Sequence, residues 1–558
     1  MSAIAPVDRF RLFVHRMGRF ARRLRLDLLL FPVHAWRALG GTGCQVLIAA
    51  PDLRTADPVI AADIQAGRFV FAGQSVEAGD RSPFTVIPPS DDWLRQLHSF
   101  GWLRHLRVGD TDYAQSKARI ITEFWLHDQG EAGDIAWEPA VVSRRLLSLL
   151  SQSTLILRDA DHEFYRRFVR SLLRQARQLR SGLSSIEVAV IRLQAIIAIT
   201  MTGLSLSSQE KLTRFGLERL DQELEAQILP DGGHVSRNPA ALIAILADLL
   251  PLRQAMIARG FNPSARLMRA IERMMPMLRF FRHSDGSFCH FNGMALSTTD
   301  LIATVLAYDE SLGRPVMSAS YSGYERVEAG DSVLLVDAGK PPAISASQDA
   351  HASTLAMEFS CGPQMLIVNC GAPASRHGEL RRAARVSAAH STAILNDESS
   401  SRFSGPEADA QIVSGPRHVE CKREMLADES TCLAMSHDGY IRSHGWMHTR
   451  FLALSPDGLR LNGVDDFVLK TSEAAVLPFL VRFHIHPSVQ ILTDDEIREV
   501  QLVLPDGSTW QFNANRPVTV EESLYMSDTF GSRPTEQIVV ASQTGGNSAV
   551  EWSLYRLD

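Results

Sequence analysis

The sequence predicts a chain in which an all-α region is followed by an all-β region. Between about residues 92 and 312, apolar residues recur at three- and four-residue spacing, which is the pattern of helices that bury one face. From about residue 320 the period changes to two, which is the pattern of strands. A run of helices that precedes a run of strands indicates two separate layers of structure rather than one alternating α/β sheet.

Composition excludes several classes of protein. The 558 residues are 45% hydrophobic and 22% charged, which is ordinary for a globular chain and excludes disorder and collagen-like structure. The 57 Lys and Arg residues against 63 Asp and Glu residues give a net charge of −6, so nucleic acid is not an expected partner. The 6 cysteines form no C-x-x-C pair, which excludes a zinc ribbon and a thioredoxin motif. We expect reduced, buried thiols, although oxidised pairs remain an alternative.

Residues 1–91 are expected to form a lead-in to the first domain. Residues 9–25 contain seven arginines with apolar residues between them at helical spacing, which predicts a basic amphipathic helix. Such a helix suits peripheral contact with an anionic membrane, and the alternative is a helix packed on the protein with solvated arginines. No apolar run is long enough for a transmembrane helix and no clear signal peptide is present, so a cytoplasmic or membrane-peripheral location is expected. Loops and short extended pieces should follow over residues 40–95.

A helical domain is expected over residues 92–319. Short polar or Gly/Pro breaks separate its helices, so neighbours should pack as antiparallel hairpins in a toroid or solenoid. No repeating sequence motif accompanies them. The expected helices are Trp93–Leu106, Tyr113–His127, Pro139–Leu157, His162–Arg180, Ile186–Met201, Ser208–Ile228, Ala240–Ala258 and Ala265–Phe281.

A β domain is expected over residues 320–558, with the junction at Ser320–Ser332. Asp457-Gly458 and Asp506-Gly507 are good hairpin turns, so the domain should be an antiparallel sandwich or barrel. The expected strands include Val333–Val336, Leu355–Phe359, Met365–Val368, Phe451–Leu454, Phe479–His484 and Val500–Leu504.

Several histidines occupy positions where chemistry is plausible. His234 lies in a glycine-rich loop between two helices, where the backbone can turn sharply and place a side chain in a cleft. His351 and His390 each precede a strand. Histidine is the usual acid, base and metal ligand near neutral pH, but any one of these residues could equally be solvated or structural.

In their order and spacing, the motifs of this chain resemble the heparinase II/III family of polysaccharide lyases. The resemblance extends from about residue 90 to the end, and no single motif decides it. The motifs include Leu97–Leu103, Trp137-Glu138-Pro139, Asp231-Gly232-Gly233-His234, His351-Ala352-Ser353, Val368-Asn369-Cys370-Gly371, Ala389-His390-Ser391-Thr392, Ser436–Tyr440 and Arg482–Pro487.

The resemblance implies an incomplete (α/α) toroid of the alginate lyase type, joined to a heparinase II/III-like antiparallel β-sandwich. It further implies that an acidic, uronate-containing polysaccharide is cleaved by β-elimination in a cleft between the domains. In that reaction the uronate carboxylate is neutralised, a base removes the C5 proton and an acid protonates the departing oxygen. No organic cofactor is expected.

The resemblance also assigns roles to individual residues. His234 corresponds to the α-domain histidine that contacts the uronate, and Asn238 and Arg237 are candidates for neutralising its carboxylate, because an amide or guanidinium can bind both oxygens. His351 and His390 correspond to two ligands of a zinc site, and Asn369 lies where a third ligand, usually Asp, is expected. The alternative for the two histidines is a hydrogen-bonded structural pair.

Two departures from the family pattern concern catalysis. The family often has a catalytic histidine two residues before the metal histidine, where this chain has Asp349. It also uses a tyrosine of the α domain, and here no tyrosine occurs between Tyr165 and Tyr308. His290 and Tyr440 are the candidates to carry the proton instead, and each could equally be a loop or turn residue.

Three functions therefore remain open from the sequence. The first is a lyase that acts on an acidic polysaccharide. The second is a catalytically weak or inactive glycan-binding or envelope polysaccharide biosynthesis protein on the same scaffold. The third is a glycoside hydrolase, which would need two facing carboxylates. Asp231 and Asp285 are the loop acids available for it, and both also suit turn capping.

Overall fold

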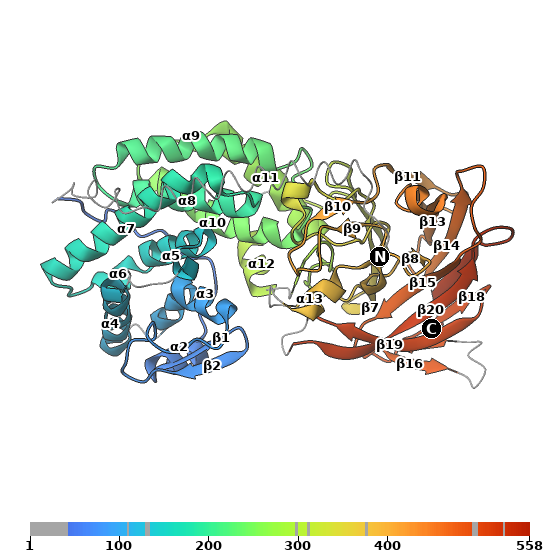
Figure 1. Ribbon diagram of the computed structural model, residues 1–558, viewed down its shortest axis with the longest axis horizontal. Helices are drawn as coiled ribbons and strands as arrows, with labels where there is room; N and C mark the ends of the chain where they lie inside the picture. The colour runs from blue at the N-terminus through green and yellow to red at the C-terminus, as the bar shows by residue number, and fades with distance from the viewer. Residues whose placement is uncertain are drawn as a thin grey trace.

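The computed structural model describes residues 43–108, 111–128, 134–295, 299–309, 313–373, 378–493, 500–527 and 531–557. Helices occupy the first part of the chain and antiparallel strands the second, side by side along the long axis of the molecule (Figure 1). The predicted order of an all-α and an all-β region is confirmed. The predicted basic helix over residues 9–25 lies outside the described residues.

A small lead-in unit precedes the helical layer. It consists of helix α2 (Pro58–Gln65) and a hairpin of strands β1 (Arg68–Phe71) and β2 (Gln74–Glu77). The unit is fixed to the helices because the indole of Trp93 donates to the carbonyl of Phe69 over 3.3 Å. The Phe69 ring also meets Trp102 edge-on, with 5.8 Å between ring centroids.

The helices begin where short polar side chains can cap them. Ser90, Asp161 and Ser264 each accept a hydrogen bond from a backbone N–H of the first turn, which satisfies one of the donors left free at a helix start. The helices are α3 (Asp91–Ser99), α4 (Asp112–Asp128), α5 (Pro139–Ser151), α6 (Ser153–Leu157), α7 (His162–Gly182), α8 (Ala189–Ser205), α9 (Glu210–Gln227), α10 (Pro239–Ala258), α11 (Ala265–Phe280) and α12 (Thr299–Leu306). Short 3-10 turns are η2 (Gly101–Arg107), η3 (Asp134–Trp137) and η4 (Leu183–Ser185).

Helix α10 is the one described helix that is long and apolar enough to cross a membrane by composition. Of its most apolar window, 72% is buried inside the fold. Its neighbours include α8 and α11, as expected for a core helix that is apolar on all sides.

Two large antiparallel sheets form most of the β region, and β9 and β10 pair separately as a two-stranded sheet. One has the order β11-β12-β13-β14-β21-β18-β17-β16 and the other β19-β20-β15-β7-β6-β5-β4-β3, with β8 beside β15. The strands are β3 (Ser318–Ala319), β4 (Tyr324–Ala329), β5 (Ser332–Asp337), β6 (Met357–Cys361), β7 (Gln364–Val368), β8 (Ala393–Leu395), β9 (Arg402–Phe403), β10 (Ile412–Ser414), β11 (Val419–Met425), β12 (Thr431–His437), β13 (Trp446–Leu454), β14 (Arg460–Leu469), β15 (Pro478–Ile485), β16 (Gln490–Thr493), β17 (Val500–Val503), β18 (Thr509–Ala514), β19 (Val518–Tyr525), β20 (Arg533–Gln543) and β21 (Val550–Arg556).

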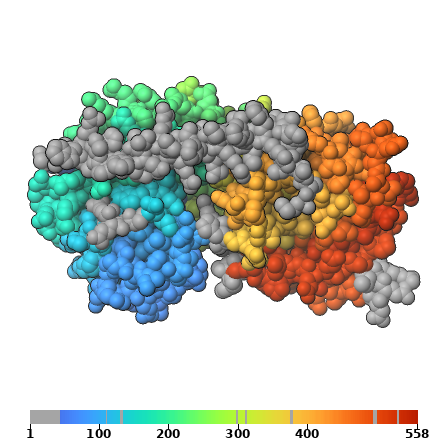
Figure 2. Space-filling view, in the orientation of Figure 1, coloured from blue at the N-terminus to red at the C-terminus, as the bar shows by residue number. Residues whose placement is uncertain are grey.

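The two halves share buried surface, and they lie against each other in Figure 2. Tyr324, Val333 and Leu335 belong to the β region but pack within the apolar cluster of the helices. The guanidinium of Arg326 donates to the carbonyls of Phe280 and Arg282, both over 2.7 Å. These contacts fix the position of the helical half relative to the sheets.

Candidate functional site

A cavity of about 520 Å³ lies between the two halves, and we call it the interdomain cavity. Helices α5, α8 and α10 supply an apolar wall of small residues. The opposite side comes from the turn η5 (Ile344–Ala346), from the residues that follow it and from helix α13 (Glu379–Ala384). The wall residues are Ala140, Val141, Val188, Ala189, Val190, Ile191, Ala240, Ala241 and Ala244.

His234 lines the interdomain cavity, where the family resemblance places it. Both of its ring nitrogens already have protein partners. Nδ1 accepts from the backbone N–H of Ser236 over 3.1 Å and lies 2.7 Å from the Ser236 hydroxyl, so Nε2 carries the proton and donates to the side-chain oxygen of Gln227 over 3.1 Å. Burial lowers the pKa of His234 to about 4, so the ring is neutral at pH 7.

Asn238 also lines the interdomain cavity, at the start of α10. Its side-chain oxygen accepts from the backbone N–H of Ala240 over 2.9 Å, which caps the helix. Capping holds the amide at the edge of the cavity but occupies its oxygen.

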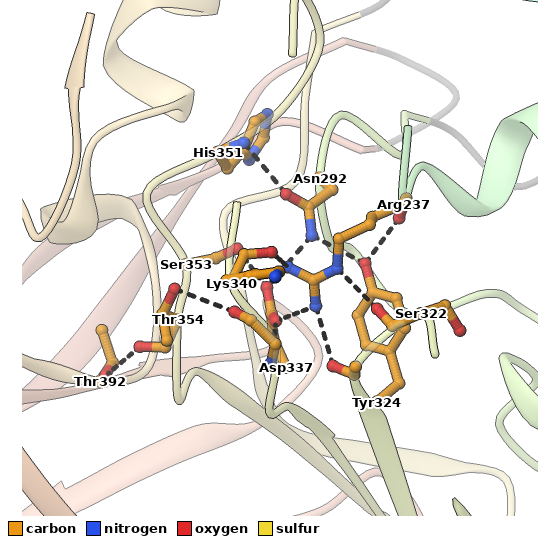
Figure 3. A network of polar contacts seen from close by, with 12 residues as sticks. Arg237, Asn292, Ser322, Tyr324, Asp337, Lys340, His351, Ser353, Thr354 and Thr392 are labelled. Carbon is orange, nitrogen blue, oxygen red and sulfur yellow. Dashed lines mark hydrogen bonds and ion pairs between the residues drawn. The ribbon is translucent and has the colours of Figure 1, made fainter. Parts of the chain in front are cut away.

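Arg237 does not line the interdomain cavity, although the sequence makes it a candidate for binding a substrate carboxylate. Its φ of +61° turns the side chain towards the β half. There the guanidinium forms an ion pair with the buried carboxylate of Asp337 and donates to the carbonyls of Ser322, Gly323 and Lys340 (Figure 3). In this structure Arg237 therefore joins the two halves, and its guanidinium is occupied by these contacts.

The same network extends to the loop that carries His351. The amide of Asn292 donates to Asp337 over 3.1 Å and to the hydroxyl of Tyr324 over 2.7 Å, and its oxygen accepts from the backbone N–H of His351 over 3.2 Å (Figure 3). The Arg237 guanidinium lies 4.6 Å above the Tyr324 ring. This buried network links the loop of His234 to the β half.

His290 lies in a different buried cluster, centred on the carboxylate of Glu358. Its Nδ1 is 3.6 Å from one Glu358 oxygen, which also accepts from the backbone N–H of His290 over 2.9 Å. Nε2 of His283 lies 3.2 Å from the other oxygen. Burial alone would raise the pKa of Glu358, but these histidines hold it below its usual range. His290 is 2% exposed and is not among the residues that line the interdomain cavity.

Of the three residues predicted to bind zinc, Asn369 is engaged in hydrogen bonds with other protein groups. The rings of His351 and His390 are 5.1 Å apart, and both nitrogens of His390 and Nδ1 of His351 are buried without a partner. Asn369, however, donates its amide to Glu358 over 3.0 Å and accepts from the backbone N–H of Ser391 over 2.9 Å. Among the described residues no group of three His, Cys, Asp or Glu side chains could hold a metal ion. The two imidazoles thus keep unpartnered nitrogens, whereas Asn369 is already hydrogen-bonded. The zinc site stays a prediction, and metal analysis of the purified protein tests it.

Tyr440 and the two loop acids have structural contacts. The Tyr440 hydroxyl donates to the carbonyl of Glu398 over 3.1 Å, and its ring belongs to the apolar core of the sandwich. Asp231 accepts from the backbone N–H groups of Gly233 and Ser322, and Asp285 accepts from Ser287. None of the three lines the interdomain cavity, so the carboxylate pair of a glycoside hydrolase is not assembled from Asp231 and Asp285.

Sequence reasoning missed two ion pairs at the interdomain cavity. Arg95 of α3 contacts both oxygens of Glu138, over 2.8 and 3.0 Å. Arg381 of α13 pairs with Asp349, the residue that stands two positions before His351. Glu138 and Asp349 both occupy positions of the family motifs, but no local pattern in the sequence indicates which arginine forms an ion pair with each of them.

Comparisons with known proteins agree with this architecture. Residues 312–553 match the family model described as heparinase II/III-like, C-terminal. FtsZ-localized protein C of Caulobacter vibrioides is 31% identical over 524 residues, which covers 91% of this chain and 89% of that protein. The crystal structure of a heparinase III is 13% identical, with a TM-score of 0.70 over 98% of this chain and 90% of that one. A mutant of the heparan sulfate lyase HepC from Pedobacter heparinus is 16% identical, with a TM-score of 0.61 over 91% and 84%. At these identities the two structures show a shared fold only.

Proposed function

The chain belongs to the heparinase II/III family, and we propose that it binds a glycan in the interdomain cavity without cleaving it by β-elimination. Family membership supports the glycan, because the family scaffold places its substrate cleft between the two domains. We infer the absence of elimination from the hydrogen bonds of His234 and Arg237. Both are fully engaged with protein groups at the place where a lyase needs free ones.

The chemistry explains why engagement matters. Removal of the C5 proton of a uronate requires a base with a free lone pair and a positive or hydrogen-bonding group that neutralises the carboxylate. The unprotonated nitrogen of His234 is held by Ser236, and the guanidinium of Arg237 faces Asp337. An N–H···N bond would have to break before His234 could accept a proton from a uronate, and the predicted proton carriers, His290 and Tyr440, do not line the interdomain cavity. This arrangement supports binding over turnover.

The test is an elimination assay combined with a binding assay. The purified full-length chain is incubated with polygalacturonate, alginate and heparan sulfate, and the ultraviolet absorbance of the new C=C bond is followed. We expect no absorbance above a protein-free control. Calorimetry with a wider set, in which neutral oligosaccharides accompany the acidic ones, should show measurable binding of at least one glycan. Absorbance that grows with time and disappears in His234→Ala would overturn the proposal in favour of a lyase.

A lyase that uses other residues is the second candidate. Asp349 and Arg381 place a carboxylate beside a guanidinium within the interdomain cavity. The carboxylate could act as the base, and the guanidinium could bind the uronate carboxylate. If this candidate is correct, Asp349→Asn abolishes the absorbance and His234→Ala does not. This candidate thus predicts absorbance, which glycan binding alone does not, and it differs from a lyase that depends on His234 in which single substitution stops the reaction.

The cellular place of the protein is a separate proposal. The Caulobacter relative is described by its name as FtsZ-localized, and its identity to this chain extends through 91% of the chain. We propose that this chain likewise localises with FtsZ. A fluorescent fusion that forms a band coincident with labelled FtsZ supports this, whereas a uniform signal contradicts it.

A further inference from the structure

The charges that face the interdomain cavity are unusual for a site that would bind an acidic chain. The described residues that line it include two guanidiniums, on Arg95 and Arg381, and three carboxylates, on Glu138, Asp349 and Asp409. The lining therefore has one excess negative charge. His234 adds no compensating cation, because its buried ring is neutral at pH 7.

Both guanidiniums are already compensated by protein carboxylates. Arg95 contacts both oxygens of Glu138 and, through Nη1, Asp92 over 3.1 Å. Nη2 of Arg381 pairs with one oxygen of Asp349. A uronate carboxylate that entered would compete with these acids for the same donors, and like charges placed together at a binding site disfavour the complex.

The Asp349–Arg381 pair still offers groups to an uncharged ligand. Both residues line the cavity, and the side chain of Asp349 is 35% exposed against 8% for that of Arg381, so the carboxylate is the more accessible group of the pair. A guanidinium N–H beside a carboxylate presents one donor and one acceptor close together. Neighbouring hydroxyl groups of a sugar ring match such a pair, because each hydroxyl both donates and accepts.

The rest of the lining agrees with an uncharged ligand. Its other polar members are neutral amides and hydroxyls, and the wall of alanine and valine side chains suits the apolar C–H faces of sugar rings or acyl methyl groups. The neutral polar members are Gln96, Ser99, Gln194, Ser236, Asn238, Ser345 and Gln348.

We infer that the interdomain cavity selects an uncharged glycan and disfavours uronate chains, with Asp349 as the specificity-determining residue. This inference rests on the proposed glycan binding and adds the class of glycan. Asp349 acts in two ways: its charge repels a carboxylate, and it keeps the Arg381 guanidinium neutralised. Replacing it by an uncharged residue leaves Arg381 as an uncompensated cation facing the cavity.

Matched oligosaccharides test the inference directly. Cellotetraose and α-1,4-galactotetraose are each compared with the corresponding tetra-uronate, which differs only by a carboxylate at C6, and an N-acetylglucosamine tetramer is added. Affinities are measured by calorimetry for the wild-type chain, Asp349→Asn and Glu379→Gln. Glu379 lies on the same helix as Arg381 with a 93% exposed side chain, and it does not line the cavity, so its substitution removes one negative charge outside the site.

We expect the wild-type chain and Glu379→Gln to bind the neutral member of a pair at least about tenfold more tightly, and Asp349→Asn to reduce that preference about tenfold or more. Tighter binding of the uronate member by the wild-type chain overturns the inference while leaving glycan binding intact. An unchanged preference in Asp349→Asn overturns the role of Asp349. Failure of every tetramer to bind contradicts the proposed function itself. If thermal unfolding shows that Asp349→Asn is misfolded, Asp349→Ser provides the same charge change.

Discussion

At the scale of single residues, internal hydrogen bonds decide which side chains remain for a ligand. The motif around His234 predicts that this histidine lies in the cleft, and it does line the interdomain cavity. The sequence does not reveal that Ser236 and Gln227 hold its ring, or that the backbone at Arg237 adopts a positive φ that directs the guanidinium to Asp337. His234 and Arg237 lie only three positions apart, yet His234 lines the interdomain cavity and Arg237 pairs with Asp337 in the β half.

Arg237→Ala is expected to destabilise the protein severely. It leaves the carboxylate of Asp337, which is 1% exposed, without its ion-pair partner, and breaking a buried pair in this way costs about 3–5 kcal/mol. Guanidinium chloride unfolding provides the measurement. The control is Arg266→Ala, which removes an exposed pair with Glu225 and should change the free energy of unfolding by less than about 1 kcal/mol. Equal losses in both variants would argue against the joining role.

The free energy of unfolding should fall as the pH is lowered, partly because His234 is buried as a neutral ring. Burial lowers its folded pKa to about 4, below the ordinary value of 6.5, so the unfolded chain binds the proton more readily. The stabilisation is complete above pH 6.5 and is lost as the pH falls from 6.5 towards 4. Between pH 7 and pH 5, His234→Gln should therefore lose about 2 kcal/mol less free energy of unfolding than the wild type. His127→Gln, at a side chain that is 84% exposed, is the control and should follow the wild type.

At the scale of elements, the apolar period located the helices well but not their interruptions. The predicted helix over residues 93–106 ends instead at Ser99, because Phe100 adopts a left-handed conformation with φ of 58° and stacks on Trp102 at 5.3 Å. The predicted helix over residues 139–157 is divided at Gln152 into α5 and α6. The first break lies beside Gly101, a local signal that the apolar pattern outweighed in the prediction. The break at Gln152 has no Gly or Pro beside it, so tertiary packing rather than local propensity sets it.

Close packing of α8 on α9 depends on glycine at the contact. A Cβ on Gly216 would lie 2.9 Å from the Cα of Thr200, so the two helices would have to separate. Gly216→Ala should lower the free energy of unfolding by about 2 kcal/mol, even though alanine is the better helix former. Thermal or chemical unfolding measures it. Glu218→Ala, on the exposed face of the same helix, should remain within about 0.5 kcal/mol of the wild type, and a comparable loss there would contradict the packing argument.

Contact with anionic membranes by the segment over residues 9–25 stays a proposal, and the alternative is that its arginines are only solvated. Each arginine near such a surface contributes about 1 kcal/mol, so replacing Arg16 and Arg19 by Glu should weaken binding by at least tenfold. Co-sedimentation with phosphatidylglycerol vesicles, and with phosphatidylcholine vesicles as the neutral control, provides the measurement. Undiminished sedimentation of the double variant would indicate that the arginines are only solvated.

At the scale of the whole molecule, the order of helical and strand patterns predicted the two-part fold, and the family motifs predicted that His234 lies close to the β half. The site itself was less predictable. Its two ion pairs, Arg95–Glu138 in the helical half and Arg381–Asp349 in the β half, join positions 43 and 32 residues apart, and each meeting depends on the tertiary packing within its own half. The zinc prediction rested on motif positions alone, and the contacts of Asn369 within the sandwich were not readable from its neighbours in sequence.

The most direct test of glycan binding without elimination is mass spectrometry of the sugar recovered from the complex. The full-length chain is incubated with the neutral and uronate tetramers, the complex is isolated by gel filtration, and the bound oligosaccharide is released and weighed. The account predicts intact neutral tetramer and little uronate. Recovery of shorter fragments that carry an unsaturated end would contradict it, because only a lyase leaves that product.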